Sequence, residues 1–157
     1  MPPEIVALQS LKDISVEENQ IGGSIPPEIT GLKSLQKIST KNNKIGGTLP
    51  ERIGDMTGLV EIKMQGNSLT GTIPPSIGNA NNLRNIYFQA NQLTGSLPTT
   101  MGNLTQLEDL FLESNDLTGI IPTECSNMVS LSEFLFTKDI HIHTPQTYQL
   151  LLDQLSL

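Results

Sequence analysis

Residues 59–82 read LVEIKMQGNSLTGTIPPSIGNANN, and this stretch decides the fold. Its first half alternates apolar and polar residues around Ile62 and Met64, which is the period of a strand with one buried face. Asn67 follows this strand, and Ile73-Pro74 opens a second half that lacks the strand period. We therefore expect a strand, a turn at the asparagine and a return segment within 24 residues.

The same pattern recurs with a constant period of 24 residues. The asparagine returns as Asn19, Asn43, Asn67, Asn91 and Asn115, and the first apolar position as Leu11, Leu35, Leu59, Leu83, Leu107 and Leu131. Because one copy cannot bury its apolar side chains alone, the copies must stack and share a continuous core. Successive strands should then be parallel and about 4.8 Å apart.

The recurring asparagines should form a stacked row, which we call the asparagine ladder. An amide side chain just past a strand can donate to and accept from backbone groups that the turn would otherwise bury unpaired. Three inward positions depart from the apolar pattern, namely Thr40, Ala80 and Cys125. We interpret them as packing adjustments, with Cys125 an inert buried thiol.

Written as LxxLxLxxNxLxGxIPxxIxxLxx, the repeat resembles the plant-type leucine-rich repeat of receptor-like kinase ectodomains and polygalacturonase-inhibiting proteins. The resemblance covers Met1 to about His143. It implies a right-handed solenoid of the α/β class, with a parallel β-sheet on the concave face and short 3-10 or turn segments on the convex face. It also implies that the chain binds another molecule and catalyses nothing.

The repeat divides the chain into four parts. We expect a partial repeat over residues 1–10, five full repeats over 11–130, a degenerate last repeat over 131–143 and a C-terminal cap over 144–157. Thr144 and Pro145 are typical of a helix start, so a capping helix is predicted from Pro145 to Ser156. Because Met1 falls in the middle of a copy, we expect the sequence to be part of a longer protein.

Composition excludes several classes of partner. The net charge of −7 argues against nucleic acid or an anionic membrane, which would need clustered Lys and Arg. The sequence contains no run of 18 apolar residues, so we expect no direct membrane insertion of this segment. We find no arrangement of nucleophile, base and orienting group, so we expect neither catalytic activity nor a cofactor.

Two short motifs near the C-terminal end carry alternatives. Asp139, His141 and His143 alternate with isoleucines, a spacing compatible with a metal site, but an edge strand that buries its isoleucines needs the same alternation. We favour the edge strand. Asn103-Leu104-Thr105 is an N-glycosylation acceptor, which matters only if the chain enters the secretory route.

The residues that alternate with the buried positions must point outward from the strand face. One outward column reads Ser15, Ser39, Lys63, Tyr87, Phe111 and Leu135, and so changes from small and polar to large and apolar. We predict that Tyr87, Phe111 and Leu135 form an apolar anchor patch, rimmed by Lys63, Gln89 and Glu113, that binds a protein or peptide partner.

A second outward row is rich in hydroxyl groups around Thr70, Thr94 and Thr118. Some similar plant repeat proteins bind ice through such rows, but Gly22, Gly46 and Ile120 interrupt this one. We therefore do not favour ice binding.

The sequence leaves three functions open. The first is a recognition module similar to a receptor or co-receptor ectodomain, which would be extracellular or membrane-anchored. The second is a structural or accessory subunit of a larger assembly, in an alga or an organelle as readily as outside a cell. The third is an inhibitor of a secreted hydrolase. The absence of a signal peptide and of paired cysteine caps in the sequence keeps the second alternative open.

Overall fold

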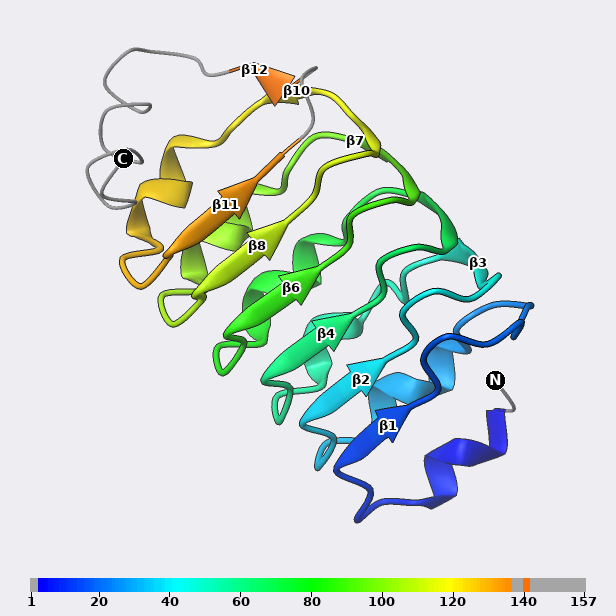
Figure 1. The fold of residues 1–157 in the computed structure, drawn as a ribbon. Helices are drawn as coiled ribbons and strands as arrows, with labels where there is room; N and C mark the ends of the chain where they lie inside the picture. The colour runs from blue at the N-terminus through cyan, green and yellow to red at the C-terminus, as the bar shows by residue number, and fades with distance from the viewer. Residues whose placement is uncertain (1–2, 137–139, 142–157) are drawn as a thin grey trace.

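The computed structural model describes residues 3–136 and 140–141, and this part of the chain is a curved stack of short strands and 3-10 helices (Figure 1). Six strands form one parallel sheet in chain order. They are β1 (Asp13–Ser15), β2 (Lys37–Ser39), β4 (Glu61–Lys63), β6 (Asn85–Tyr87), β8 (Asp109–Phe111) and β11 (Glu133–Leu135). Equivalent residues of neighbouring copies are register partners, as Ile62 and Ile86 are. The predicted solenoid with its parallel sheet is confirmed.

A second set of short strands lies beside this sheet. A four-stranded parallel sheet contains β3 (Gly46–Thr48), β5 (Ser68–Gly71), β7 (Gln92–Gly95) and β9 (Asp116–Leu117). Further along the stack, β10 (Gly119–Ile120) pairs in parallel with β12 (Ile140–His141). We call the surface formed by these strands the lateral face.

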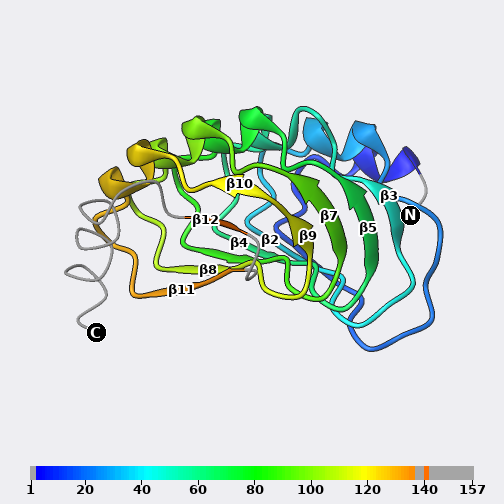
Figure 2. The ribbon, with the colours of Figure 1, turned by 90° about the horizontal axis from the view of Figure 1, so that it is seen from above.

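The 3-10 helices form the outer side of the curve, and the six-stranded sheet lies along the inner side (Figure 2). They are η1 (Pro3–Ala7), η2 (Pro27–Gly31), η3 (Ile53–Asp55), η4 (Pro75–Asn79), η5 (Thr99–Asn103) and η6 (Thr123–Asn127). The predicted arrangement of strands inside and 3-10 segments outside is therefore what the structure shows. The helix predicted for Pro145–Ser156 lies outside the described residues.

One continuous core runs between the strands and the 3-10 helices. The leucines that open the copies, from Leu35 to Leu107, are buried, and so are the isoleucines that follow them in the strands. Cys125 and Ala80 are completely buried at their inward positions. Stacking therefore buries the apolar columns that a single copy would leave exposed.

Two residues with hydroxyl side chains are more buried than serine and threonine usually are. Thr40 is fully buried at an apolar position, as its slot in the repeat requires, and its hydroxyl has no hydrogen-bond partner. Ser39 stands in the outward column, yet it is only 7% exposed. Its register partner across the sheet is Lys63, and a serine is short enough to lie below the surface that longer neighbours define.

The asparagine ladder ties each copy to the copy before it. The Asn67 amide nitrogen donates to the carbonyl oxygens of Thr40 at 2.9 Å and of Met64 at 3.1 Å, and its oxygen accepts the Ile45 N–H at 3.0 Å. Equivalent bonds recur at Asn43, Asn91 and Asn115. Asn19 lies in the first copy, and its side chain bonds only to nearby carbonyl oxygens.

The residue before each ladder asparagine has a left-handed backbone. The φ angle is 66° at Gly66, 54° at Ala90 and 55° at Ser114, and the two preceding copies behave alike. Glycine adopts this conformation freely, whereas alanine does so at a cost. The turn geometry is therefore imposed by the stack even where the local sequence does not favour it.

Replacing Asn67 with alanine should lower the free energy of unfolding by about 1–3 kcal/mol, because the buried Ile45 N–H and Thr40 carbonyl lose their partner. Gln65→Ala is the matched control two residues away, since the Gln65 side-chain oxygen has no hydrogen-bond partner to lose. It should cost under about 0.5 kcal/mol. Chemical denaturation measures both, and equal losses would overturn the ladder's role.

Thr40→Val should leave the stability unchanged or raise it by about 1 kcal/mol, because it removes a buried hydroxyl without a partner and keeps the side-chain shape. Thr94→Val is the control, since the exposed Thr94 hydroxyl donates to the Gly71 carbonyl. That change should be neutral or slightly destabilising. A clear loss of stability in Thr40→Val alone, measured by denaturant midpoint, would show that the hydroxyl has a partner in solution.

Candidate functional site: the strand face

The inner face of the six-stranded sheet carries the predicted site residues in adjacent copies. Lys63, Tyr87 and Phe111 are register partners along β4, β6 and β8, and Leu135 follows on β11. The first three are half-buried, whereas Leu135 is 49% exposed. The structure therefore brings the whole predicted apolar column together on one open surface.

Tyr87 and Phe111 form a stacked pair. Their ring centroids are 5.2 Å apart and the ring planes differ by 18°. The Lys63 ammonium lies over the Tyr87 ring, 5.5 Å from its centroid, and also pairs with Glu61 at 3.0 Å. A cation and two rings thus form one continuous stack across three strands, held by quadrupole attraction as well as by burial.

Asp109 organises the polar side of this stack. One of its carboxylate oxygens accepts hydrogen bonds from the Tyr87 hydroxyl at 2.7 Å and from the Asn85 amide at 2.9 Å. The Ser132 hydroxyl donates to the other oxygen at 3.4 Å. The Ser132 hydroxyl also lies 3.0 Å from the Glu108 carbonyl oxygen, so its one proton is shared between the two acceptors. Two neutral donors from the preceding copy therefore hold the carboxylate, while no described cation pairs with it.

Gln89 and Glu113, the other predicted rim residues, stand two positions after Tyr87 and Phe111. Together with Gln65 they form a column of half-buried side chains. Each has one side-chain oxygen that is shielded from solvent and that accepts no hydrogen bond from the described residues. This column therefore contains three acceptor oxygens without a described donor.

The surroundings raise the pKa of Tyr87 above its ordinary value. Burial of the phenol is the largest cause, followed by the hydrogen bond to Asp109 and by the charges of Asp109, Glu61 and Glu133. The phenol is therefore neutral at physiological pH and serves as a hydrogen-bond donor. The negative charges that contribute to this shift converge on the aromatic pair.

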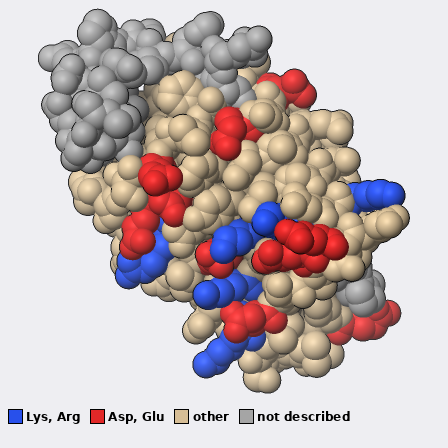
Figure 3. Space-filling view, in the orientation of Figure 1, with Lys and Arg blue, Asp and Glu red and all other residues tan. Residues whose placement is uncertain are grey.

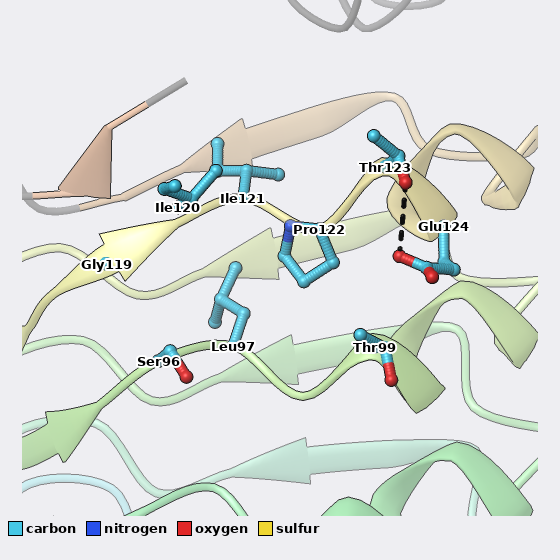
Figure 4. A pocket seen from close by; sticks show the side chains of 9 residues that line it. All are labelled: Ser96, Leu97, Thr99, Gly119, Ile120, Ile121, Pro122, Thr123 and Glu124. Atoms are coloured by element: carbon cyan, nitrogen blue, oxygen red, sulfur yellow. Dashed lines mark hydrogen bonds between the residues drawn. The ribbon is translucent and has the colours of Figure 1, made fainter. Parts of the chain in front are cut away.

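A shallow pocket of about 460 Å³ opens on the lateral face (Figure 4). Its wall is mostly apolar, with Leu97, Ile121 and Pro122 beside the exposed Ile120. Its polar members include Thr123, whose hydroxyl donates to the Glu124 carboxylate at 3.3 Å. Apart from this hydroxyl–carboxylate pair, the wall offers mainly apolar contact.

The sequence singles out one thiol and one candidate metal motif. Burial, and secondarily the charge of Glu124, raises the pKa of the Cys125 thiol to about 12, so it stays protonated. Within the described residues, no three His, Cys, Asp or Glu side chains lie close enough to share a metal ion. Ile140–His141 forms a strand. Asp139 and His143, the other two residues of the candidate metal site, lie outside the described residues.

Asn103 ends η5 on the outer side of the curve, and its side chain is exposed. The next residue, Leu104, is fully buried, and the Thr105 N–H donates to the Asn103 carbonyl at 2.9 Å. Glycosylation at Asn103 stays a prediction. None of the helices in the described part of the chain is long and apolar enough to cross a bilayer.

Sequence reasoning placed the column but missed how its members interact. Asp109 lies two residues before Phe111, but its bond to Tyr87 was not predicted. A usable signal exists, because outward residues two positions apart lie on the same face and neighbouring copies are one strand spacing apart. A tyrosine hydroxyl is long enough to cross that spacing diagonally.

The repeats identify the family. The leucine-rich repeat model matches residues 10–32, 58–80, 82–104 and 106–128, which is more than half of the chain. The chain belongs to the leucine-rich repeat family. No curated protein sequence matches it.

Solved structures similar to this chain include plant receptor proteins. The ectodomain of the Arabidopsis thaliana receptor kinase GASSHO1/SCHENGEN3, in complex with CASPARIAN STRIP INTEGRITY FACTOR 2, superposes with a TM-score of 0.91 at 32% identity. The match covers 96% of this chain and 18% of the ectodomain. The plant peptide hormone receptor RGFR1, in complex with RGF2, gives 0.90 and 35%, covering 99% of this chain and 24% of that one.

A plant ice-binding protein is also similar, with a TM-score of 0.77 at 27% identity over 90% of this chain and 45% of that protein. The chain thus spans about a fifth to a quarter of the two receptor structures and under half of the ice-binding protein. The likeness to plant receptor ectodomains was expected from the repeat pattern, and it is confirmed.

The Tyr87 phenol should titrate above the ordinary tyrosine value of about 10. Asp109→Asn should lower this pKa without restoring it fully, because burial is the larger cause. Ultraviolet difference titration in a Tyr148→Phe background reports Tyr87 alone. Since the folded-state pKa is raised, stability from the neutral phenol is present below pH 10 and is lost as the pH rises above it. An unchanged pKa in Asp109→Asn would contradict the Tyr87–Asp109 contact.

Proposed function

We propose that this chain is a non-catalytic recognition module that binds a protein or peptide partner through the strand face. The single observation that supports this most is the stack of Lys63, Tyr87 and Phe111, continued by the exposed Leu135, at the centre of an open sheet face. Half-buried aromatic anchors inside a polar rim are the usual anatomy of a protein interface.

The similar structures support the same function. The GASSHO1/SCHENGEN3 ectodomain is in complex with CASPARIAN STRIP INTEGRITY FACTOR 2. RGFR1, a peptide hormone receptor, is in complex with RGF2. A segment of five or six copies presents the same kind of curved strand face on a smaller scale. We propose that the chain contributes such a face within a plant-type receptor or co-receptor ectodomain.

Catalysis does not fit the arrangement of groups. The Asp109 carboxylate is held by neutral donors, and Cys125 is buried as a thiol with a raised pKa. The Tyr87 hydroxyl beside Asp109 is kept neutral by its raised pKa, and Cys125 is kept protonated by burial, so neither is the activated nucleophile that covalent or general acid–base chemistry requires. The aromatic stack positions a partner rather than transforms it.

Phe111→Ala should weaken binding to the natural partner by at least about 1–2 kcal/mol, as removal of an interface anchor does. It should cost no more than about 1 kcal/mol of stability, the order of one lost aromatic stack. Phe88→Ala is the contrast, because Phe88 is fully buried and its loss should cost about 3–5 kcal/mol of stability.

The partner is captured from the source organism, identified by mass spectrometry and remade, and its affinity is measured by calorimetry alongside thermal unfolding. If Phe111→Ala unfolds the protein as readily as Phe88→Ala does, the ring belongs to the core. If it folds normally and keeps full affinity, the partner uses another face, and the alternative of a structural subunit gains support.

A further inference from the structure

The charges on the strand face separate along the solenoid. Four lysines lie on or beside the first three strands of the main sheet, namely Lys12, Lys37, Lys41 and Lys63. Between residues 85 and 136 there is no Lys or Arg, while six acidic residues occur there. Figure 3 shows the same division, with blue side chains over the strands up to β6 and only red ones beside β8 and β11.

Three of the cations near this face already form ion pairs. Lys41 pairs with Glu18, Lys63 pairs with Glu61, and Arg84 pairs with Glu108. Three carboxylates around the anchor patch have no described cationic partner, namely those of Asp109, Glu113 and Glu133. Within the described residues, the end of the face that carries the aromatic anchors is therefore the end whose carboxylates lack a cationic partner.

These carboxylates flank the anchors on both sides. Asp109 lies two residues before Phe111 on β8, and its register partner Glu133 lies two residues before Leu135 on β11. Glu113 lies two residues after Phe111, and one of its oxygens has no hydrogen-bond donor. Residues two apart in a strand share a face, so Phe111 stands between carboxylates along its own strand.

The stack already accommodates a cation at one end. Lys63 lies over Tyr87, whose ring in turn stacks on Phe111. Among the described residues, Phe111 has no second ring or cation contact, so its side away from Tyr87 is free of such a partner. Leu135 is the register partner of Phe111 on that side, so a second cation from a ligand would approach the half-exposed part of the Phe111 ring, near carboxylates that lack a described cationic partner.

We propose that the occupant of this end of the strand face is an extended, basic peptide segment carrying an arginine, whose guanidinium stacks on Phe111 and pairs with the flanking carboxylates. This inference rests on the proposed function and specifies the chemistry of the partner. Arginine fits better than lysine because its planar guanidinium stacks on rings and forms bidentate bonds with carboxylates. An acidic segment would be repelled by the same three carboxylates.

The length of the segment follows from the spacing of the strands. Tyr87 and Leu135 are two strand spacings apart, about 10 Å, which three or four extended residues cover. A bulky apolar side chain near the arginine would then reach the exposed Leu135. The expected recognition element is therefore short, with positive charge and an apolar residue close together.

The test uses a random-peptide display library selected against the 157-residue chain. Selected peptides should be rich in arginine beside apolar residues, and synthetic copies should lose affinity as salt is raised. The double variant Glu113→Gln/Glu133→Gln should weaken them about tenfold or more. Replacing the peptide's arginine with citrulline, which keeps the shape and removes the charge, should have a similar effect.

The matched control removes two carboxylates on the outer side of the curve, in Glu28→Gln/Glu51→Gln. Both side chains are exposed and neither forms an ion pair, so affinity should change less than about twofold. An equal loss in this control would mean that net charge alone attracts the peptides, and the inference would be wrong.

The outcomes also separate this inference from the proposed function. If selected peptides depend on Phe111 but are not basic, or are insensitive to the Glu113→Gln/Glu133→Gln change, the strand face binds peptides of another class and this inference alone fails. If no peptide is selected, or if Phe111→Ala binds every selected peptide as well as the original chain, the proposed peptide site fails with it.

Discussion

The asparagine ladder is the interaction on which the rest of this structure depends. Each amide from Asn43 to Asn115 bonds to carbonyl oxygens of its own copy and of the copy before, and accepts an N–H from that preceding copy. A buried amide satisfied on both sides fixes the offset between two copies, because any other offset would leave polar groups unpaired. Equivalent residues therefore stand in columns, and the face inherits the order of the copies.

Columns of this kind turn the surface into a one-dimensional pattern. Each copy contributes one residue to each outward column. A change of residue type from copy to copy therefore becomes a change along the face. Ser39 is nearly buried beside Lys63, whereas three copies later Phe111 stacks on Tyr87. The core stays uniform while the outward column changes, and specificity can vary without disturbing the fold.

The sequence could predict the solenoid, the inward columns and the position of the apolar patch, because all three depend on period alone. Other features depend on contacts between copies. Ala90 has a left-handed backbone that alanine does not favour, and only Gly66 and Asn42 among its equivalents hint at it. The bond from Tyr87 to Asp109 needs the diagonal distance between strands, and the burial of Ser39 needs the lengths of its neighbours. Neither quantity can be read from the sequence of a single copy.

Charge placement on β8 and β11 points to selection for binding rather than for stability. Asp109 and Glu133 are register partners, and like charges directly opposite each other in a sheet destabilise it. Earlier copies avoid this conflict, since Lys37 faces Glu61 in the same column and Asn85 donates to Asp109. A sheet optimised only for folding would continue that alternation. Local rules of stability are most often broken at functional sites, so the unpaired carboxylates beside Phe111 fit a face completed by a cationic partner.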